Sequence, residues 1–356
     1  MTEGNSGLDA TDQELLNALQ WDFPLDPHPY ARLGERLGMD ADEVMERIRR
    51  LKDAGILRQL SAIFDTRALG YGSSLVAARV DPERVDDAAA VISAHPGVSH
   101  NYKRNHAFNL WYTVAVPPGH AVADHVDVLH RESGAESTRM LPTLTLYKIG
   151  VKLDMTGKTS AAARAEVQDH ERPERSPDMT TPELSPLETA AIRVVQEDLP
   201  LEERPYAAQA KAIGGTNGHA LDEHGVLDLL GSFKERKLMR RFAAVMNHRE
   251  AGFKANAMAV WAVPEDRLNE VGPTMASFAS VSHCYRRPTY PDWPYSVFTM
   301  VHGRNARDCE ETVDAIRAET GVDEYCLLWS VKEYKKVRVK YFTEDWDAWI
   351  AEHLRP

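Results

Sequence analysis

The segment GILRQLSAIFDTRALGYGSSLVAARV, Gly55 to Val80, returns in altered form as LMRRFAAVMNHREAGFKANAMAVWAV, Leu238 to Val263. Further along, VSHNYKR (Val98 to Arg104) is matched by VSHCYRR (Val281 to Arg287). Self-similarity at a fixed spacing indicates a duplicated structural unit. We therefore expect the two repeats to pair within one chain as the subunits of a dimer do, with the functional site where they meet.

Each repeat divides into a helical part and a mixed part. Three short amphipathic patterns precede the alternating run ILRQLSAIFD, which predicts a winged helix-turn-helix. The order strand, helix, strand, strand, helix, strand follows in both repeats and predicts a ferredoxin-like βαββαβ domain. The predicted class is α+β, a tandem repeat of these two domains forming an intramolecular pseudo-dimer. The expected boundaries are winged helix-turn-helix domains at 8–66 and 184–248, ferredoxin-like domains at 67–150 and 249–342, a linker at 151–183 and a tail at 343–356.

Composition narrows the classes of partner. The 356 residues carry a formal net charge of -12, which argues against a general nucleic-acid binder but leaves room for a local basic site. The three cysteines form no CxxC pair, so neither a disulfide framework nor a zinc site is expected. The polar N-terminus does not resemble a signal peptide, and no apolar run approaches the roughly 18 residues of a membrane span. These features predict a cytoplasmic protein.

The stretch HNYKRNHAFNLWYT, His100 to Thr113, groups polar side chains in a way that a core strand does not. Read with period two, it places His100, Tyr102, Arg104 and His106 on one face of an extended segment. The second repeat places His283, Tyr285 and Arg287 in the same arrangement. The repetition of the grouping favours a functional role over an incidental one.

A winged helix joined to a ferredoxin-like domain through GILRQLSAIFDTRALGY resembles the AsnC/Lrp family of regulators, which bind DNA with the first domain and small effectors with the second. HNYKRNHAFNLWYT and SHCYRRPTYPDWPYSVFTM resemble, more narrowly, the siroheme decarboxylases, which reuse this fold. Members of that family occur as two homologous subunits or as a fusion of both, and this chain resembles the fused form over both repeats.

The resemblance implies removal of the C12 and C18 acetate carboxyls of siroheme to give 12,18-didecarboxysiroheme. That product leads to haem d1, the route that the fused form favours, or to protohaem by the alternative route. The implied partners are siroheme itself and either homologous decarboxylase subunits or a second copy of the chain.

Binding siroheme requires cations for its eight carboxylates and flat walls for its macrocycle. Arginine forks suit carboxylates, and Arg104 and Arg287 occupy equivalent positions, as do Lys103 and Arg286. His106 is a further candidate for substrate binding. The candidate walls are the aromatic residues on or beside the next strand of each half: Trp111, Tyr112, Trp293, Tyr295 and Phe298.

Loss of carbon dioxide from a pyrrole acetate leaves an electron pair that a protonated macrocycle can accept, and a second proton must reach the new methyl carbon. No external cofactor and no protein-bound metal are expected, because the iron enters with the substrate. Histidine titrates near neutrality and anionic neighbours raise its pKa, so His100 or His283 could be the general acid. Tyr102 and Tyr285 are alternative donors or orienting groups, and His106 could act similarly or ligate the iron.

Two other functions share parts of this pattern. A transcriptional regulator would use the helix from Asp40 to Lys52 for recognition, but four acidic residues at its start would repel phosphate, which argues against DNA as a partner. A non-catalytic haem or tetrapyrrole sensor would need the same arginines but no proton donors.

Overall fold

The computed structural model describes residues 8–21, 23–149, 164, 183–217, 221–246 and 255–354. The chain forms two compact units. The first lies within residues 1–71, 179–250 and 340–346, and the second within 72–178, 251–339 and 347–356. Each unit therefore combines equivalent parts of both repeats. The expected linker, 151–183, lies outside the described residues except for Arg164 and Glu183.

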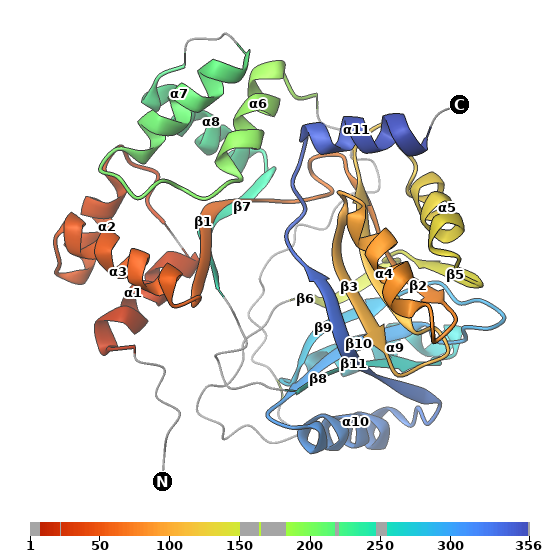
Figure 1. Cartoon of the computed structure of the whole chain (residues 1–356). Coiled ribbons are helices and arrows are strands. Elements are labelled where there is room, and N and C mark those ends of the chain that lie inside the picture. The colour runs from red at the N-terminus through yellow and green to blue at the C-terminus, as the bar shows by residue number, and fades with distance from the viewer. Residues whose placement is uncertain are drawn as a thin grey trace. The chain divides into compact units, whose positions relative to one another are not determined.

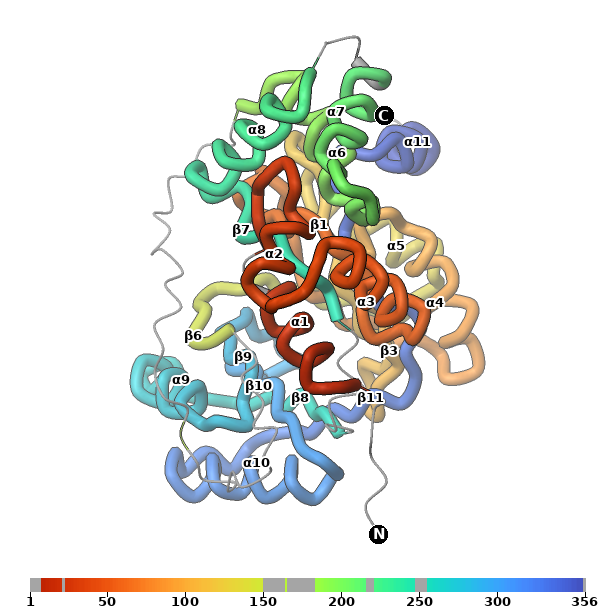
Figure 2. Tube along the Cα trace, turned by 90° about the vertical axis from the view of Figure 1, so that its left-hand side faces the viewer, coloured from red at the N-terminus to blue at the C-terminus, as the bar shows by residue number. Residues whose placement is uncertain are grey.

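The first unit contains the two helix-turn-helix parts, each followed by one strand (Figure 2). Its elements are α1 (Ala10–Trp21), α2 (Pro29–Leu37), α3 (Ala41–Asp53), β1 (Leu57–Phe64), α6 (Pro186–Val195), α7 (Pro205–Asn217), α8 (Glu223–Glu235) and β7 (Met239–Met246). The third helix of each part begins at an aspartate, Asp40 or Asp222, whose side chain accepts a backbone N–H of the first turn. Strands β1 and β7 pair antiparallel, so the two repeats share one ribbon.

The second unit contains the two predicted βαββαβ domains. The first is β2 (Gly72–Arg79), α4 (Val85–Ala94), β3 (Val98–Arg104), β4 (Leu110–Val116), α5 (Val122–Ser133), β5 (Ser137–Leu141) and β6 (Thr145–Ile149). The second is β8 (Ala255–Trp261), the 3-10 turn η2 (Glu265–Arg267), α9 (Leu268–Ser277), β9 (Val281–Arg286), β10 (Val297–Gly303), α10 (Ala306–Thr320) and β11 (Tyr325–Lys336). Helix α11 (Glu344–His353) lies in the segment expected to be a tail. The predicted α+β class is confirmed.

The two βαββαβ domains exchange strands to form one nine-stranded sheet of order β5-β2-β4-β3-β11-β8-β10-β9-β6. Strand β6 leaves its own half and pairs with β9, where Leu146 lies opposite Tyr285. The first part of β11 pairs with β8 of its own half, and its second part pairs with β3, where Glu333 lies opposite Tyr102 (Figure 1). Each half therefore completes the sheet of the other.

Close packing holds the exchanged strand β6 in place. The hydroxyl of Tyr147 donates a hydrogen bond to the carbonyl of Leu268, 3.2 Å away. A Cβ atom at Gly272 of α9 would lie 2.3 Å from the Tyr147 ring. Glycine at this position is therefore needed for the helix to approach the exchanged strand.

Three apolar clusters organise the second unit. Helices α4 and α5 cover one face of the first half, and α9 and α10 cover one face of the second. The helix-free faces meet in a third cluster that contains Ala77, Trp111 and Leu141 from the first half and Met258, Val260, Phe298 and Leu328 from the second. The helix-free faces therefore form the boundary between the halves around this cluster. None of the helices in the described parts of the chain is both long and apolar enough to cross a membrane.

Candidate active site

A β-bulge in β3, repeated in β9, orients the predicted site residues. In β3 the register passes from Val98 to His100 and leaves Ser99 unpaired, and in β9 it passes from Val281 to His283 and leaves Ser282 unpaired. The Ser99 hydroxyl lies 2.9 Å from Nδ1 of His100, and the Ser282 hydroxyl lies 2.8 Å from Nδ1 of His283. Bulges commonly re-aim side chains beside active sites. A serine hydroxyl that donates to Nδ1 leaves the imidazole proton on Nε2.

Beyond each bulge the period of two returns and builds a row of three side chains. We call them the first row (His100, Tyr102, Arg104) and the second row (His283, Tyr285, Arg287). The histidine and tyrosine rings are 6.2 Å apart in the first row and 6.0 Å apart in the second, nearly parallel in both. The arginine Cζ lies over the tyrosine ring at 5.7 Å in the first row and 4.8 Å in the second. The two rows are thus close copies of one arrangement.

The arginines of the two rows are buried and bind across the halves. Arg104 is 8% exposed and donates from Nη1 to the carbonyl of Leu328, 2.8 Å away. Arg287 is 9% exposed and donates to the carbonyl of Leu141. Each carbonyl belongs to a strand of the opposite half, so both arginines hold the halves together. One Nη of each guanidinium is therefore already occupied, and the binding of carboxylates by the two arginines stays a prediction.

The guanidinium of Arg104 can nevertheless still bind an anion through its remaining N–H groups. Burial lowers its pKa to about 10, which records the cost of holding a cation away from water. Within the described residues no carboxylate forms an ion pair with it, and its Nε has no hydrogen-bond partner. Buried charges are normally paired, so this guanidinium is suited to an incoming carboxylate.

Lys103 and Arg286 lie on the opposite face of the sheet from the rows. Lys103 shares its face with Asn101, whose amide donates to the carbonyl of Ala89 in α4. Arg286 forms an ion pair with Glu265 of η2 at 2.5 Å. Side chains that follow one another in a strand point to opposite faces, so neither cation can join the neighbouring arginine. The structure therefore places both side chains away from Arg104 and Arg287, and their role in binding substrate stays a prediction.

The expected aromatic walls are mostly core side chains. Trp111 is 1% exposed and its Nε1 donates to the carbonyl of Phe108 at 2.7 Å, while Trp293 is fully buried beside it. Both belong to the third cluster with Phe298, and Tyr112 faces the helices instead. Their burial reflects how much apolar area they contribute to the core. Only Tyr295, half-buried with its ring 4.9 Å from Trp293, keeps an accessible surface among these residues.

His106 lies in the loop after β3, half-buried against the same aromatic side chains. Its Nδ1 accepts the backbone N–H of Phe108 at 3.0 Å, and its ring centroid lies 5.4 Å from that of Trp293. Burial lowers the pKa of His106. Because Nδ1 is occupied, His106 would bind substrate or iron through its Nε2.

The electrostatics of His100 differ from the expectation for a general acid. Burial lowers its pKa, the nearby charge of Lys336 lowers it further, and Glu333 opposes both. The protein alone therefore does not raise the pKa of His100, as a general acid would require. Anionic carboxylates of a bound substrate would act in the direction that raises the pKa.

Two serines and a fourth histidine near the rows were not predicted from the sequence. Ser99 and Ser282 could have been found, because VSH opens both copies of the motif. His302 of β10 gives no such signal, since its counterpart in β4 is Ala115. Its Nε2 lies 2.6 Å from the Ser282 hydroxyl.

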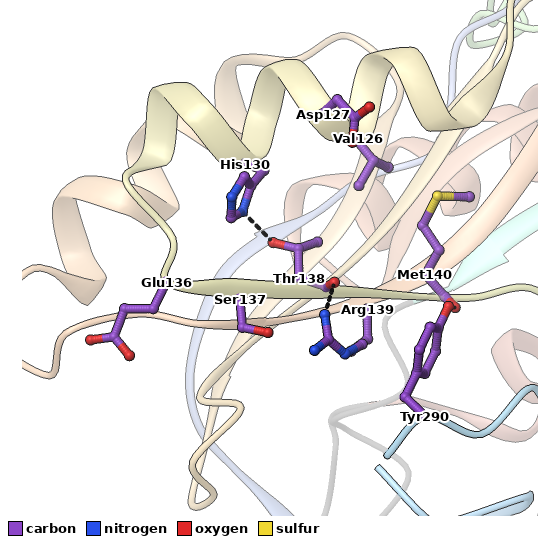
Figure 3. Close-up of a pocket in the computed structure, with 9 residues that line it drawn as sticks. All are labelled: Val126, Asp127, His130, Glu136, Ser137, Thr138, Arg139, Met140 and Tyr290. Carbon is purple, nitrogen blue, oxygen red and sulfur yellow. Dashed lines mark hydrogen bonds between the residues drawn. The ribbon is translucent and has the colours of Figure 1, made fainter. Parts of the chain in front are cut away.

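A polar hollow of about 520 Å³ lies apart from the rows, between α5, β5 and Tyr290 (Figure 3). Its lining is Val126, Asp127, His130, Glu136, Ser137, Thr138, Arg139, Met140 and Tyr290. Arg139 forms a two-pronged ion pair with Asp292, and His130 lies 3.0 Å from the Thr138 hydroxyl. Because these polar groups are already satisfied, the rows are the stronger candidate site.

The cations of α3 are occupied within the first unit. Arg47 pairs with Asp9, Asp12 and Glu43, while Arg50 also binds Asp12. Arg49 pairs with Glu46. A recognition helix needs its cations available to phosphates, so this pairing argues against DNA binding.

Models of known protein families match the helix-turn-helix parts and the βαββαβ domains of this chain separately. The model of an AsnC-like ligand binding domain matches residues 68–148 and 250–335. The model of a siroheme decarboxylase NirDL-like HTH domain matches residues 12–58 and 188–240. Both matches occur twice, once in each repeat.

Several individual relatives are named as siroheme decarboxylases or as subunits of one. A siroheme decarboxylase of Hydrogenobacter thermophilus is 37% identical over 95% of this chain and 97% of its own length. The siroheme decarboxylase beta subunit of Methanosarcina barkeri is 41% identical over 42% of this chain and 94% of its own length. The crystal structure of the siroheme decarboxylase NirDL in co-complex with an iron-uroporphyrin III analogue has a TM-score of 0.75 at 33% identity, covering 97% of this chain and 98% of that one. The chain belongs to the siroheme decarboxylase family.

Proposed function

We propose that this chain is a carboxy-lyase that removes the C12 and C18 acetate carboxyls of siroheme and releases 12,18-didecarboxysiroheme. The observation that carries the proposal is the duplication of a row that joins a histidine, a tyrosine and a buried arginine on the paired helix-free faces. Membership of the siroheme decarboxylase family supports it. A regulator or a passive tetrapyrrole sensor would have no use for two copies of a proton donor.

The chemistry requires one net proton for each carboxylate lost. Protonation of the macrocycle beside the acetate provides the acceptor for the electron pair as carbon dioxide leaves. A proton then reaches the exocyclic carbon to give the methyl group, and the ring proton is lost. Nε2 of His100 or His283, oriented by the adjacent serine, is suited to donate, with Tyr102 or Tyr285 as the neighbouring hydroxyl.

The arginines position the substrate in this proposal. Siroheme brings eight carboxylates, and a guanidinium with a free edge binds carboxylate through charge-assisted hydrogen bonds. Arg104 retains an unpartnered Nε beside Tyr102, so it is suited to hold a carboxylate near His100.

The proposal also covers the cofactors, the pathway, the compartment and the partners of the enzyme. Proton transfer and carbon dioxide loss need no cofactor, and the iron belongs to the substrate. The product would enter haem d1 biosynthesis, or alternatively protohaem biosynthesis, in the cytoplasm. Because some relatives are named as separate subunits, a second copy or a homologous subunit is a further proposed partner.

The purified full-length chain should convert siroheme under anaerobic conditions. We expect the mass spectrum of the tetrapyrrole to show successive losses of one and then two carbon dioxides, with no added cofactor. Heat-denatured protein is the control for spontaneous decarboxylation. Siroheme recovered unchanged from correctly folded protein would reject the proposed function.

A further inference from the structure

The two rows differ in how far their hydrogen bonds extend. In the first half, the contact between Ser99 and His100 spans 2.9 Å. In the second half, the Ser282 hydroxyl lies 2.8 Å from Nδ1 of His283 and 2.6 Å from Nε2 of His302. Three groups in the second half therefore form a hydrogen-bonded chain.

The sheet register explains why the first half has no counterpart. Thr113 of β4 lies opposite His100, and Met300 of β10 lies opposite His283. Two residues further along each strand, on the same face, β4 carries Ala115 where β10 carries His302. The additional imidazole is thus particular to the second half.

The exchanged strands give the two histidines different surroundings. Lys336 and Glu333, both exposed, lie opposite His100 and Tyr102. Ile149 and Leu146 take these places opposite His283 and Tyr285. His100 therefore has titratable neighbours, whereas the aliphatic neighbours of His283 cannot donate or accept a proton. An acid in such surroundings needs another route for its proton.

The chain of three groups provides such a route. Ser282 is 3% exposed, and its hydroxyl can accept one hydrogen bond while donating another. Protonated His302, which is half-buried, can give its Nε2 proton to the Ser282 oxygen. The Ser282 proton then moves to Nδ1 of His283, and His283 can release the proton on its Nε2. The charge thus passes from His302 to His283 and leaves with the donated proton. Exchange with solvent then gives His302 a new proton and returns His283 to the tautomer that carries its proton on Nε2.

We propose that His302 is a proton-relay residue, acting through Ser282 to deliver a proton to Nδ1 of His283 as His283 gives up the proton on its Nε2 in decarboxylation. This inference rests on the proposed function, because each carbon dioxide released consumes one proton. His302 does not need to touch the substrate. It also assigns different proton supplies to the two halves: the charged neighbours Lys336 and Glu333 for His100 and a relay for His283.

His302→Gln and His302→Ala separate proton transfer from hydrogen bonding. The Gln amide can still donate to Ser282 but cannot gain or lose a proton in the working pH range. In anaerobic single-turnover reactions with siroheme, we expect both variants to slow one decarboxylation about tenfold or more, with siroheme binding unchanged. Free imidazole should restore the rate of His302→Ala, where it can occupy the vacated space, but not that of His302→Gln. His224→Gln, a change at an exposed histidine of α8, is the matched control.

Three results would overturn the relay. A His302→Gln variant with the wild-type rate would show that a hydrogen bond suffices, and a slow His302→Ala variant that imidazole does not restore would show a structural role. Ser282→Ala should be slow with or without imidazole, and a wild-type rate in that variant would also contradict the relay. Wild-type protein that leaves siroheme unchanged would instead reject the proposed function.

Discussion

Replacing His283 by Ala is expected to slow the loss of one carbon dioxide from siroheme by about 10²–10⁴-fold, the usual contribution of a positioned general acid. The bulge at Ser282 holds the His283 ring by Nδ1, so removing the imidazole leaves the other groups of the second row in place. The same change at His100 is expected to slow the other loss. In both variants a tetrapyrrole that has lost a single carboxyl should accumulate.

Mass spectrometry of quenched anaerobic reactions gives the two rates separately. His224→Ala, at an exposed position in the first unit, should behave as wild type. Circular dichroism should confirm that all three variants are folded. Wild-type turnover in both His100→Ala and His283→Ala would reject the assignment of these histidines as acids.

Replacing Arg104 by Met is expected to weaken siroheme binding about 10–100-fold, the loss of roughly 1.5–3 kcal/mol for a charge-assisted hydrogen bond. Methionine keeps an unbranched apolar stem but removes the guanidinium. Arg104→Lys should recover only part of the affinity, because an ammonium group cannot present a fork to a carboxylate. The change in the siroheme absorbance spectrum on titration measures the dissociation constant.

Arg104 also binds the carbonyl of Leu328, so folding must be measured alongside affinity. Arg307→Met is the matched control, since that side chain is 84% exposed and pairs along its own helix with Glu311. An Arg104→Met variant that is folded and binds siroheme as tightly as wild type would show that this arginine serves only to join the halves.

The fold was largely predictable because its signals are local or repeated. Amphipathic patterns indicate the helices, and the duplicated VSH motif indicates equivalent strands. The strand exchange was not predictable in detail. Residues 325–336 form the single strand β11, whereas the equivalent stretch in the first half is divided into β5 and β6 by a break at residues 142–144. Which half each strand joins is decided by packing such as that of Tyr147 against Gly272.

The site was only partly predictable, for reasons that differ between residues. Strict alternation indicates that His100, Tyr102 and Arg104 share a face, and the structure places them together. The same alternation already separates Lys103 from Arg104, a consequence that the grouping of cations by charge alone overlooked. Burial of Trp111 and Trp293 depends on how the helix-free faces meet, and no local pattern encodes that. His302 reaches Ser282 from a neighbouring strand, so its role depends on register.

The central claim is that this chain decarboxylates siroheme with protons that the protein delivers. Its most direct test is the mass spectrum of the product formed from siroheme by the full-length protein in deuterium oxide without oxygen. The expected product has lost two carbon dioxides and carries one deuterium in each new methyl group. Siroheme of unchanged mass, or a decarboxylated product without deuterium in its new methyl groups, would contradict the account.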